Sequence, residues 1–67
     1  MTKRECIEYI KAEQEKAHAK VLAIIHGEIK DDYCKPIRDC FSRCKKVCAD
    51  NGYVGECFNH LWSRASR

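Results

Sequence analysis

The residues of this chain most capable of chemistry are its cysteines, which make up six of the 67 positions: Cys6, Cys34, Cys40, Cys44, Cys48 and Cys57. Thiols at this density are used either as disulfides or as thiolate ligands of a metal ion. A chain of this length buries only about 60% of the surface that its unfolded form exposes, so a staple is commonly needed. We expect three disulfides, each contributing about 2–4 kcal/mol to stability.

The spacing of the cysteines restricts how they could pair. Three of them follow at intervals of four residues and form one row on a helix, the sulfur line: Cys40, Cys44 and Cys48. Neighbours along a helix have poor disulfide geometry, so each should pair with one of the other three cysteines. Antiparallel packing favours Cys6 with Cys48 and places Cys57 opposite Cys44 or Cys40, which leaves the remaining one for Cys34. A first helix of about 30 Å would overshoot a second of about 18 Å, so an unpaired Cys6 or a Cys6-linked dimer is the alternative.

A metal site is the other use of these sulfurs. Cys44, Cys48, Cys57 and His60 offer three thiolates and an imidazole, which is a ligand set of structural zinc. Their spacing matches no common zinc finger, because the first pair lies within a predicted helix. No catalytic set stands out, since sulfurs on apolar helix faces are usually inert. We therefore expect no enzyme activity, no metal and no cofactor.

The pattern of apolar residues predicts a small all-α, three-helix, disulfide-stapled domain over residues 1–67, with helices at about 3–30, 36–50 and 54–65. Thr2 and Glu5 form a capping box at the start, and Pro36 suits the first turn of the second helix. No stretch alternates as a strand would. The predicted core comprises Ile10, Val21, Ile25, Ile37, Phe41, Val47, Val54, Phe58 and Leu61, with Trp62 at its edge.

Charge indicates a binding surface. The formal charge is +3, and basic residues crowd the second helix and the C-terminal tail, where Arg64 and Arg67 lie. Such a face would be attracted to anionic membranes, acidic channel mouths or nucleic acid, and of these we expect a membrane protein or a membrane surface and no nucleic acid. The predicted partner-binding residues are Arg38, Arg43, Lys45, Lys46, Trp62 and Arg64.

Part of the chain resembles arthropod venom peptides. Ala23-Ile24-Ile25-His26 and the spacing Cys34-x9-Cys44-x3-Cys48-x8-Cys57 are similar to the scorpine and long-chain potassium-channel toxin group of scorpions. That resemblance implies the alternative fold, an N-terminal helix followed by a cysteine-stabilised α/β module. Trp62 and Arg64 stand where the family has its last two cysteines.

A second resemblance fits the helices. Cys44-x3-Cys48-x8-Cys57 followed by Leu61 is similar to the close of the arthropod hyperglycaemic-hormone fold, which helical spider and centipede toxins also use. This resemblance implies the pairs Cys6–Cys48, Cys34–Cys44 and Cys40–Cys57.

The cysteine-dense scaffold, the absence of a catalytic set and the basic surface predict a secreted peptide of toxin, hormone or host-defence (antimicrobial) type that binds an ion channel, a receptor or a membrane surface, and both resemblances point to the same class. No apolar signal region follows Met1, and the longest apolar run is the five residues 21–25, too short to span a bilayer. The chain is therefore expected to be a mature secreted form or, alternatively, a small intracellular or mitochondrial intermembrane-space cysteine protein. In that alternative it would be a structural, metal-binding or assembly factor.

Overall fold

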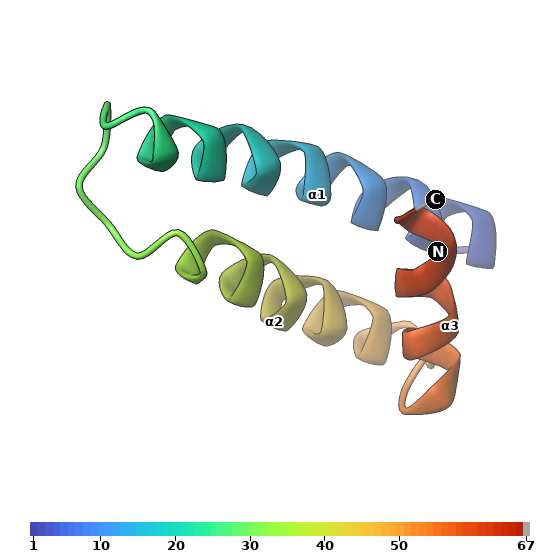
Figure 1. Cartoon of the computed structure of the whole chain (residues 1–67). Coiled ribbons are helices and arrows are strands. Elements are labelled where there is room, and N and C mark those ends of the chain that lie inside the picture. The colour runs from blue at the N-terminus through green and yellow to red at the C-terminus, as the bar shows by residue number, and fades with distance from the viewer. Residues whose placement is uncertain (67) are drawn as a thin grey trace.

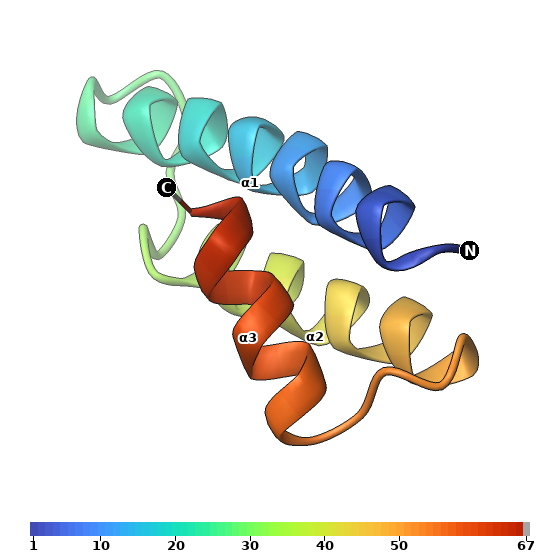
Figure 2. The ribbon, with the colours of Figure 1, turned by 90° about the vertical axis from the view of Figure 1, so that its right-hand side faces the viewer.

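Three helices form the chain in the computed structural model, which describes residues 1–66: α1 (Lys3–Ile25), α2 (Lys35–Asp50) and α3 (Glu56–Ala65). The all-α prediction is confirmed. Helices α1 and α2 run antiparallel, and α3 lies across the end of this hairpin that holds the N-terminus (Figures 1 and 2). No strand occurs within residues 1–66, so the alternative of a cysteine-stabilised α/β module is wrong.

Side-chain and glycine caps set the ends of the first two helices. The Thr2 hydroxyl accepts from the Glu5 amide at 3.2 Å, while the Glu5 carboxylate accepts from the Thr2 amide at 3.0 Å, which is the predicted capping box. Gly27 and Gly52 follow α1 and α2 with φ of 81° and 88°. At both ends the amides of the glycine and of the next residue bond back to carbonyls of the last turn, forming Schellman motifs.

Two predicted helix boundaries are corrected. Helix α1 ends at Ile25 and does not continue to about residue 30, because the left-handed Gly27 turns the chain away. Helix α3 begins at Glu56 and not at residue 54, because Gly55 has φ 60° and ψ −127°, outside the helical region. Helix α1 is longer than α2, but it ends early, and the connection at 26–34 links the two helices. Cys6 near the start of α1 therefore still lies beside Cys48 near the end of α2.

The core lies where the three helices meet, in the half of the hairpin that α3 covers. Its members come from α1 (Cys6, Ile10, Ala17), from α2 (Cys40, Cys44, Cys48) and from α3 (Phe58, Leu61, Ala65). The rings of Phe41 and Phe58 meet edge to face at 5.1 Å, and Trp62 packs on Phe41 at 5.0 Å. The core is therefore made largely of thiols on one side and aromatic rings on the other.

Burial of Ile10, Phe58 and Leu61 is confirmed, and Trp62 is half-buried at the edge as predicted. Val21, Phe41 and Val47 are only half-buried. The prediction is wrong for Ile25, Ile37 and Val54, which are 64%, 44% and 59% exposed. The first two lie beyond the reach of α3, and Val54 lies in the connection before α3.

Candidate functional site

The buried thiol cluster occupies the interface between α1 and α2; it comprises the sulfur line and one cysteine from α1: Cys6, Cys40, Cys44 and Cys48. Because they are four residues apart, the cysteines of the sulfur line share one face of α2, and this face packs against α1. Cys6, in the first two turns of α1, completes the cluster. Each of the four is at most 2% exposed. These cysteines occupy core positions that leucine or valine fills in most small proteins, and they pack there as small apolar side chains.

Burial controls the acidity of these thiols. It raises the pKa of Cys44 to about 12, with the neighbouring Cys40 adding to the effect. Burial also raises the pKa of Cys40, and burial together with the adjoining Cys6 thiol raises that of Cys48. Because the thiolate is the form that attacks electrophiles and binds metals, the raised pKa values make Cys40, Cys44 and Cys48 unreactive at neutral pH in this state.

The predicted metal ligands are not brought together. Cys44 and Cys48 are buried between α1 and α2, whereas Cys57 and His60 are exposed on α3. Among residues 1–66 no three His, Cys, Asp or Glu side chains converge as a metal site would require. The zinc arrangement drawn from sequence spacing therefore has no counterpart in this fold.

All six cysteines are free thiols in this structure, so the predicted stapling stays a prediction. The interaction between the Cys48 and Cys6 thiols agrees with the antiparallel argument that placed these two together. Cys34 and Cys57, the two exposed thiols, lie at the N-terminal ends of α2 and α3. Because Cys6 is completely buried, it is inaccessible to a second chain in this fold.

Two of the predicted partner-binding arginines are engaged within the chain. Arg43 Nη1 donates to the Glu13 carboxylate of α1 at 2.5 Å, and this ion pair raises the pKa of Arg43. Lys16 approaches the same carboxylate at 3.7 Å. Arg38 reaches Asp32 at 3.5 Å, ahead of α2. Both arginines therefore form ion pairs within the chain in the absence of a partner.

The other predicted partner-binding residues divide into two groups. Lys45 and Lys46 are exposed on α2, on the side away from the sulfur line. Trp62 is half-buried because its ring packs on Phe41 and Phe58, so only its edge meets solvent. Arg64 is exposed on the last turn of α3, where it faces the first turns of α1.

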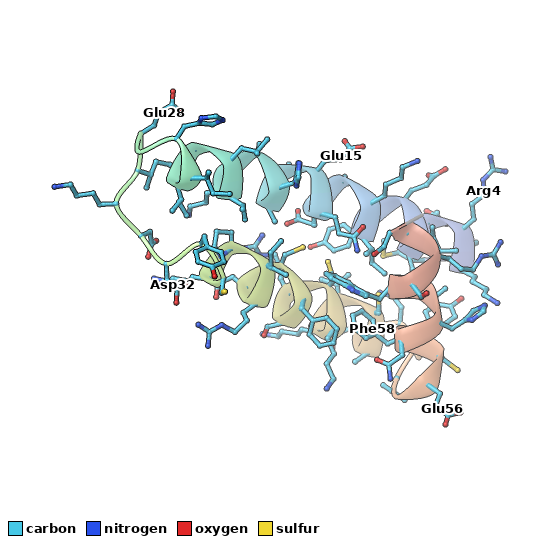
Figure 3. All side chains as sticks on the ribbon, in the orientation of Figure 1. Arg4, Glu15, Glu28, Asp32, Glu56 and Phe58 are labelled. Atoms are coloured by element: carbon cyan, nitrogen blue, oxygen red, sulfur yellow. The ribbon has the colours of Figure 1, made fainter. Side chains whose placement is uncertain are left out.

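Arg64 belongs to a basic concave surface, a shallow hollow of about 530 Å³ between α1 and α3. We call this surface the basic hollow. Its cations come from both helices: Lys3, Arg4, Lys11 and Arg64. Half-buried Ile7 gives the hollow an apolar floor, and Glu8 pairs with Arg4 at 3.6 Å. Figure 3 shows Arg4 projecting into solvent at this end of the molecule.

The sequence prediction missed the three cations that α1 contributes to the basic hollow: Lys3, Arg4 and Lys11. Lys3, Ile7 and Lys11 recur at intervals of four residues, so the sequence places them on one face of α1. Their proximity to Arg64, however, arises from the docking of α3, which the chain order does not reveal.

A smaller hollow of about 280 Å³ adjoins the basic hollow, since Lys3 lines both. Leu61 and Tyr53 give it an apolar lining, with Cys57, His60 and Lys3 around them. Cys57 is therefore an exposed thiol at the edge of a hollow, whereas Cys40, which lines a different hollow between α1 and α2, is itself buried.

Comparison with known proteins gives no relative: no family model, no curated protein and no solved structure matches the chain. None of the described helices is long and apolar enough to cross a membrane.

Proposed function

We propose that the protein is a secreted, disulfide-stabilised peptide of toxin, hormone or host-defence type that binds an acidic site on a membrane protein through the basic hollow. The observation that carries this proposal is the convergence of four cations from two helices on one concave surface. An acidic loop or ring of carboxylates, such as the mouth of a cation channel, is the complementary partner.

The lining of this hollow carries a net positive charge. Four cations against the single carboxylate of Glu8 give +3, which equals the formal charge of the chain. The remaining nine basic and nine acidic residues cancel. The protein therefore presents one positive end, and its field would orient an approaching acidic partner toward that end before contact.

Helix energetics support the same assignment. Lys3 and Arg4 lie in the first turn of α1, where the helix dipole disfavours cations. The capping box of Thr2 and Glu5 offsets part of that cost. Charges placed against a local preference are typical of binding surfaces, where recognition takes precedence over stability.

Charge reversal tests the proposal. We would compare the double variant Lys11→Glu/Arg64→Glu with the matched control Lys45→Glu/Lys46→Glu, which changes net charge equally on α2. The probes are a poly-glutamate peptide and phosphatidylserine-containing vesicles, each at low and physiological salt. The hollow variant should lose most of its peptide binding, and the control should keep most of it.

Each outcome has a distinct reading. Equal losses in both variants would show that only net charge matters, and peptide binding that neither reversal changes would remove the basic residues from the mechanism. Vesicle binding without peptide binding would replace the membrane protein with the lipid surface as the partner. In that case the loss of the two cations alone, at about 1 kcal/mol each, corresponds to roughly 30-fold, and repulsion between the two new carboxylates and the anionic lipid adds to that loss.

A further inference from the structure

The end of the hairpin opposite α3 carries uncovered apolar side chains. Five large ones are 40% to 64% exposed there, the hairpin-end patch: Leu22, Ile25, Ile29, Tyr33 and Ile37. Figure 1 shows the connection between α1 and α2 at the end remote from α3, and Figure 3 marks it with Glu28 and Asp32. The patch is thus spatially separate from the basic hollow.

The patch continues faces that α3 covers further along the hairpin. On α1, Ile25 lies three turns beyond Gln14, which donates to Ser66 at the end of α3 at 2.8 Å. On α2, Ile37 lies one turn before Phe41, which packs on Phe58 and Trp62. The last buried residue of α1 is Ala17. The short α3 thus covers one half of the hairpin and leaves the other half apolar and open.

We propose that the hairpin-end patch is the interface of a dimer formed with a second copy of this chain. With 40% to 64% of each side chain exposed, the five together present on the order of 500 Å², which is within the range of the largest apolar patches on monomeric proteins. Two such patches facing each other would bury about 1,000 Å², the lower limit for a specific interface. A two-fold arrangement is the usual way for one surface to meet its own copy.

Charge favours a second copy over an acidic or basic partner. Between residues 20 and 39 four cations balance four carboxylates: Lys20, Lys30, Lys35 and Arg38 against Glu28, Asp31, Asp32 and Asp39. The hairpin end is therefore neutral and mixed in sign, so two copies meet there without net repulsion. The two basic hollows, each +3, then lie at opposite ends of the dimer, beyond a screening length of about 8 Å.

The dimer stands independently of what the basic hollow binds. The interface is small, so we expect a dissociation constant in the micromolar range, well below 1 mM. Wild-type protein should therefore sediment as a monomer when dilute and as a dimer when concentrated.

Sedimentation velocity on the full chain tests this inference, with Ile25→Asp as the disruptive variant and Val54→Asp as the matched control. Both positions are similarly exposed, at 64% and 59%, so neither substitution should disturb the core, and circular dichroism checks that the helices persist. Ile25→Asp should weaken the dimer at least tenfold, whereas Val54→Asp should leave its dissociation constant unchanged.

Three results would overturn the dimer. One is a wild-type chain that stays monomeric at 1 mM, and another is a dimer that Ile25→Asp leaves intact. The third is a monomer that binds phosphatidylcholine vesicles in a manner abolished by Ile25→Asp, which would assign the hairpin-end patch to a membrane surface.

Discussion

Replacement of Phe58 by alanine should remove most of the stability of this protein. Phe58 is 1% exposed, and its ring lies 5.1 Å from that of Phe41 and 6.1 Å from that of Trp62. Truncation of a buried Phe to Ala costs about 3–5 kcal/mol. At about 0.05–0.15 kcal/mol per residue, a chain of this size has roughly 3–10 kcal/mol in total. The variant should therefore be marginally folded or unfolded at room temperature.

A milder substitution keeps the prediction measurable. Phe58→Leu preserves most of the buried volume but loses the contacts with Phe41 and Trp62, so it should cost about 1–2 kcal/mol. For a domain of this size that loss lowers the melting temperature by about 4–8 °C per kcal/mol. Urea unfolding followed by Trp62 fluorescence and by circular dichroism would measure it. Trp62 is the single tryptophan, and it reports directly on the aromatic cluster.

The matched control is Ile25→Ala, which removes an apolar side chain that is 64% exposed. It should change the free energy of unfolding by no more than about 0.5 kcal/mol. All proteins must be compared in the same oxidation state and at a concentration where they are monomeric. An Ile25→Ala cost equal to that of Phe58→Leu, or a Phe58→Ala variant as stable as wild type, would refute the assignment of the core.

Three further predictions concern the thiols and the backbone. In the reduced protein a maleimide should label two cysteines, Cys34 and Cys57, at the rate of free thiols, and the buried thiol cluster only upon unfolding; six equal rates would contradict the fold. The reduced protein should also lose stability as pH rises above about 9, because the pKa of Cys44 is raised from 9.0 to about 12 in the folded state. Its contribution is fully present below the unfolded pKa and is lost on the way to the folded one, so alkaline melting temperatures that do not fall would refute the burial. Gly55→Ala should destabilise by about 1–3 kcal/mol, since the φ of 60° and ψ of −127° at Gly55 are strained for alanine, and a neutral result in urea unfolding would contradict that backbone.

Local signals in the sequence were sufficient for much of the fold. The capping box at Thr2 and Glu5 forms as predicted, and the apolar periodicity of α2 and α3 correctly identifies their buried faces at Cys44 and Phe58. These features depend on residues three or four apart, which a helix brings together wherever it lies. They could therefore be read without any tertiary information.

The errors arise where tertiary packing decides. Ile25 and Ile37 have the periodicity of core residues but are exposed, because α3 ends before it reaches them. Glu13, a charged residue on the core side of α1, is only 9% exposed because Arg43 and Lys16 meet its carboxylate there. Helical periodicity reports which face is apolar, but it does not report how far the neighbouring helix extends.

The candidate site likewise has one part that the sequence predicts and another part that depends on tertiary packing. Arg64 was predicted from its charge alone, whereas Lys3, Arg4 and Lys11 join it only through the docking of α3 on α1. The basic residues on α2 were predicted to bind a partner because they cluster in the sequence. In the structure, however, Arg43 is paired with Glu13. Charge density along a sequence therefore overstates a surface whose cations already have partners in the fold.

The proposed binding surfaces offer a reason for a helix α1 that is longer than the core requires. Helix α1 buries only residues between Cys6 and Ala17, and its remaining turns make no contribution to the monomer's core. If stability of the monomer were the only constraint, a shorter helix with polar residues at Leu22 and Ile25 would serve equally well. The apolar extension gains a physical role when a second copy covers it, because burial then supplies free energy that the monomer lacks. The proposed surfaces would thus place recognition at one end of the molecule, at the basic hollow, and association at the other, at the hairpin-end patch.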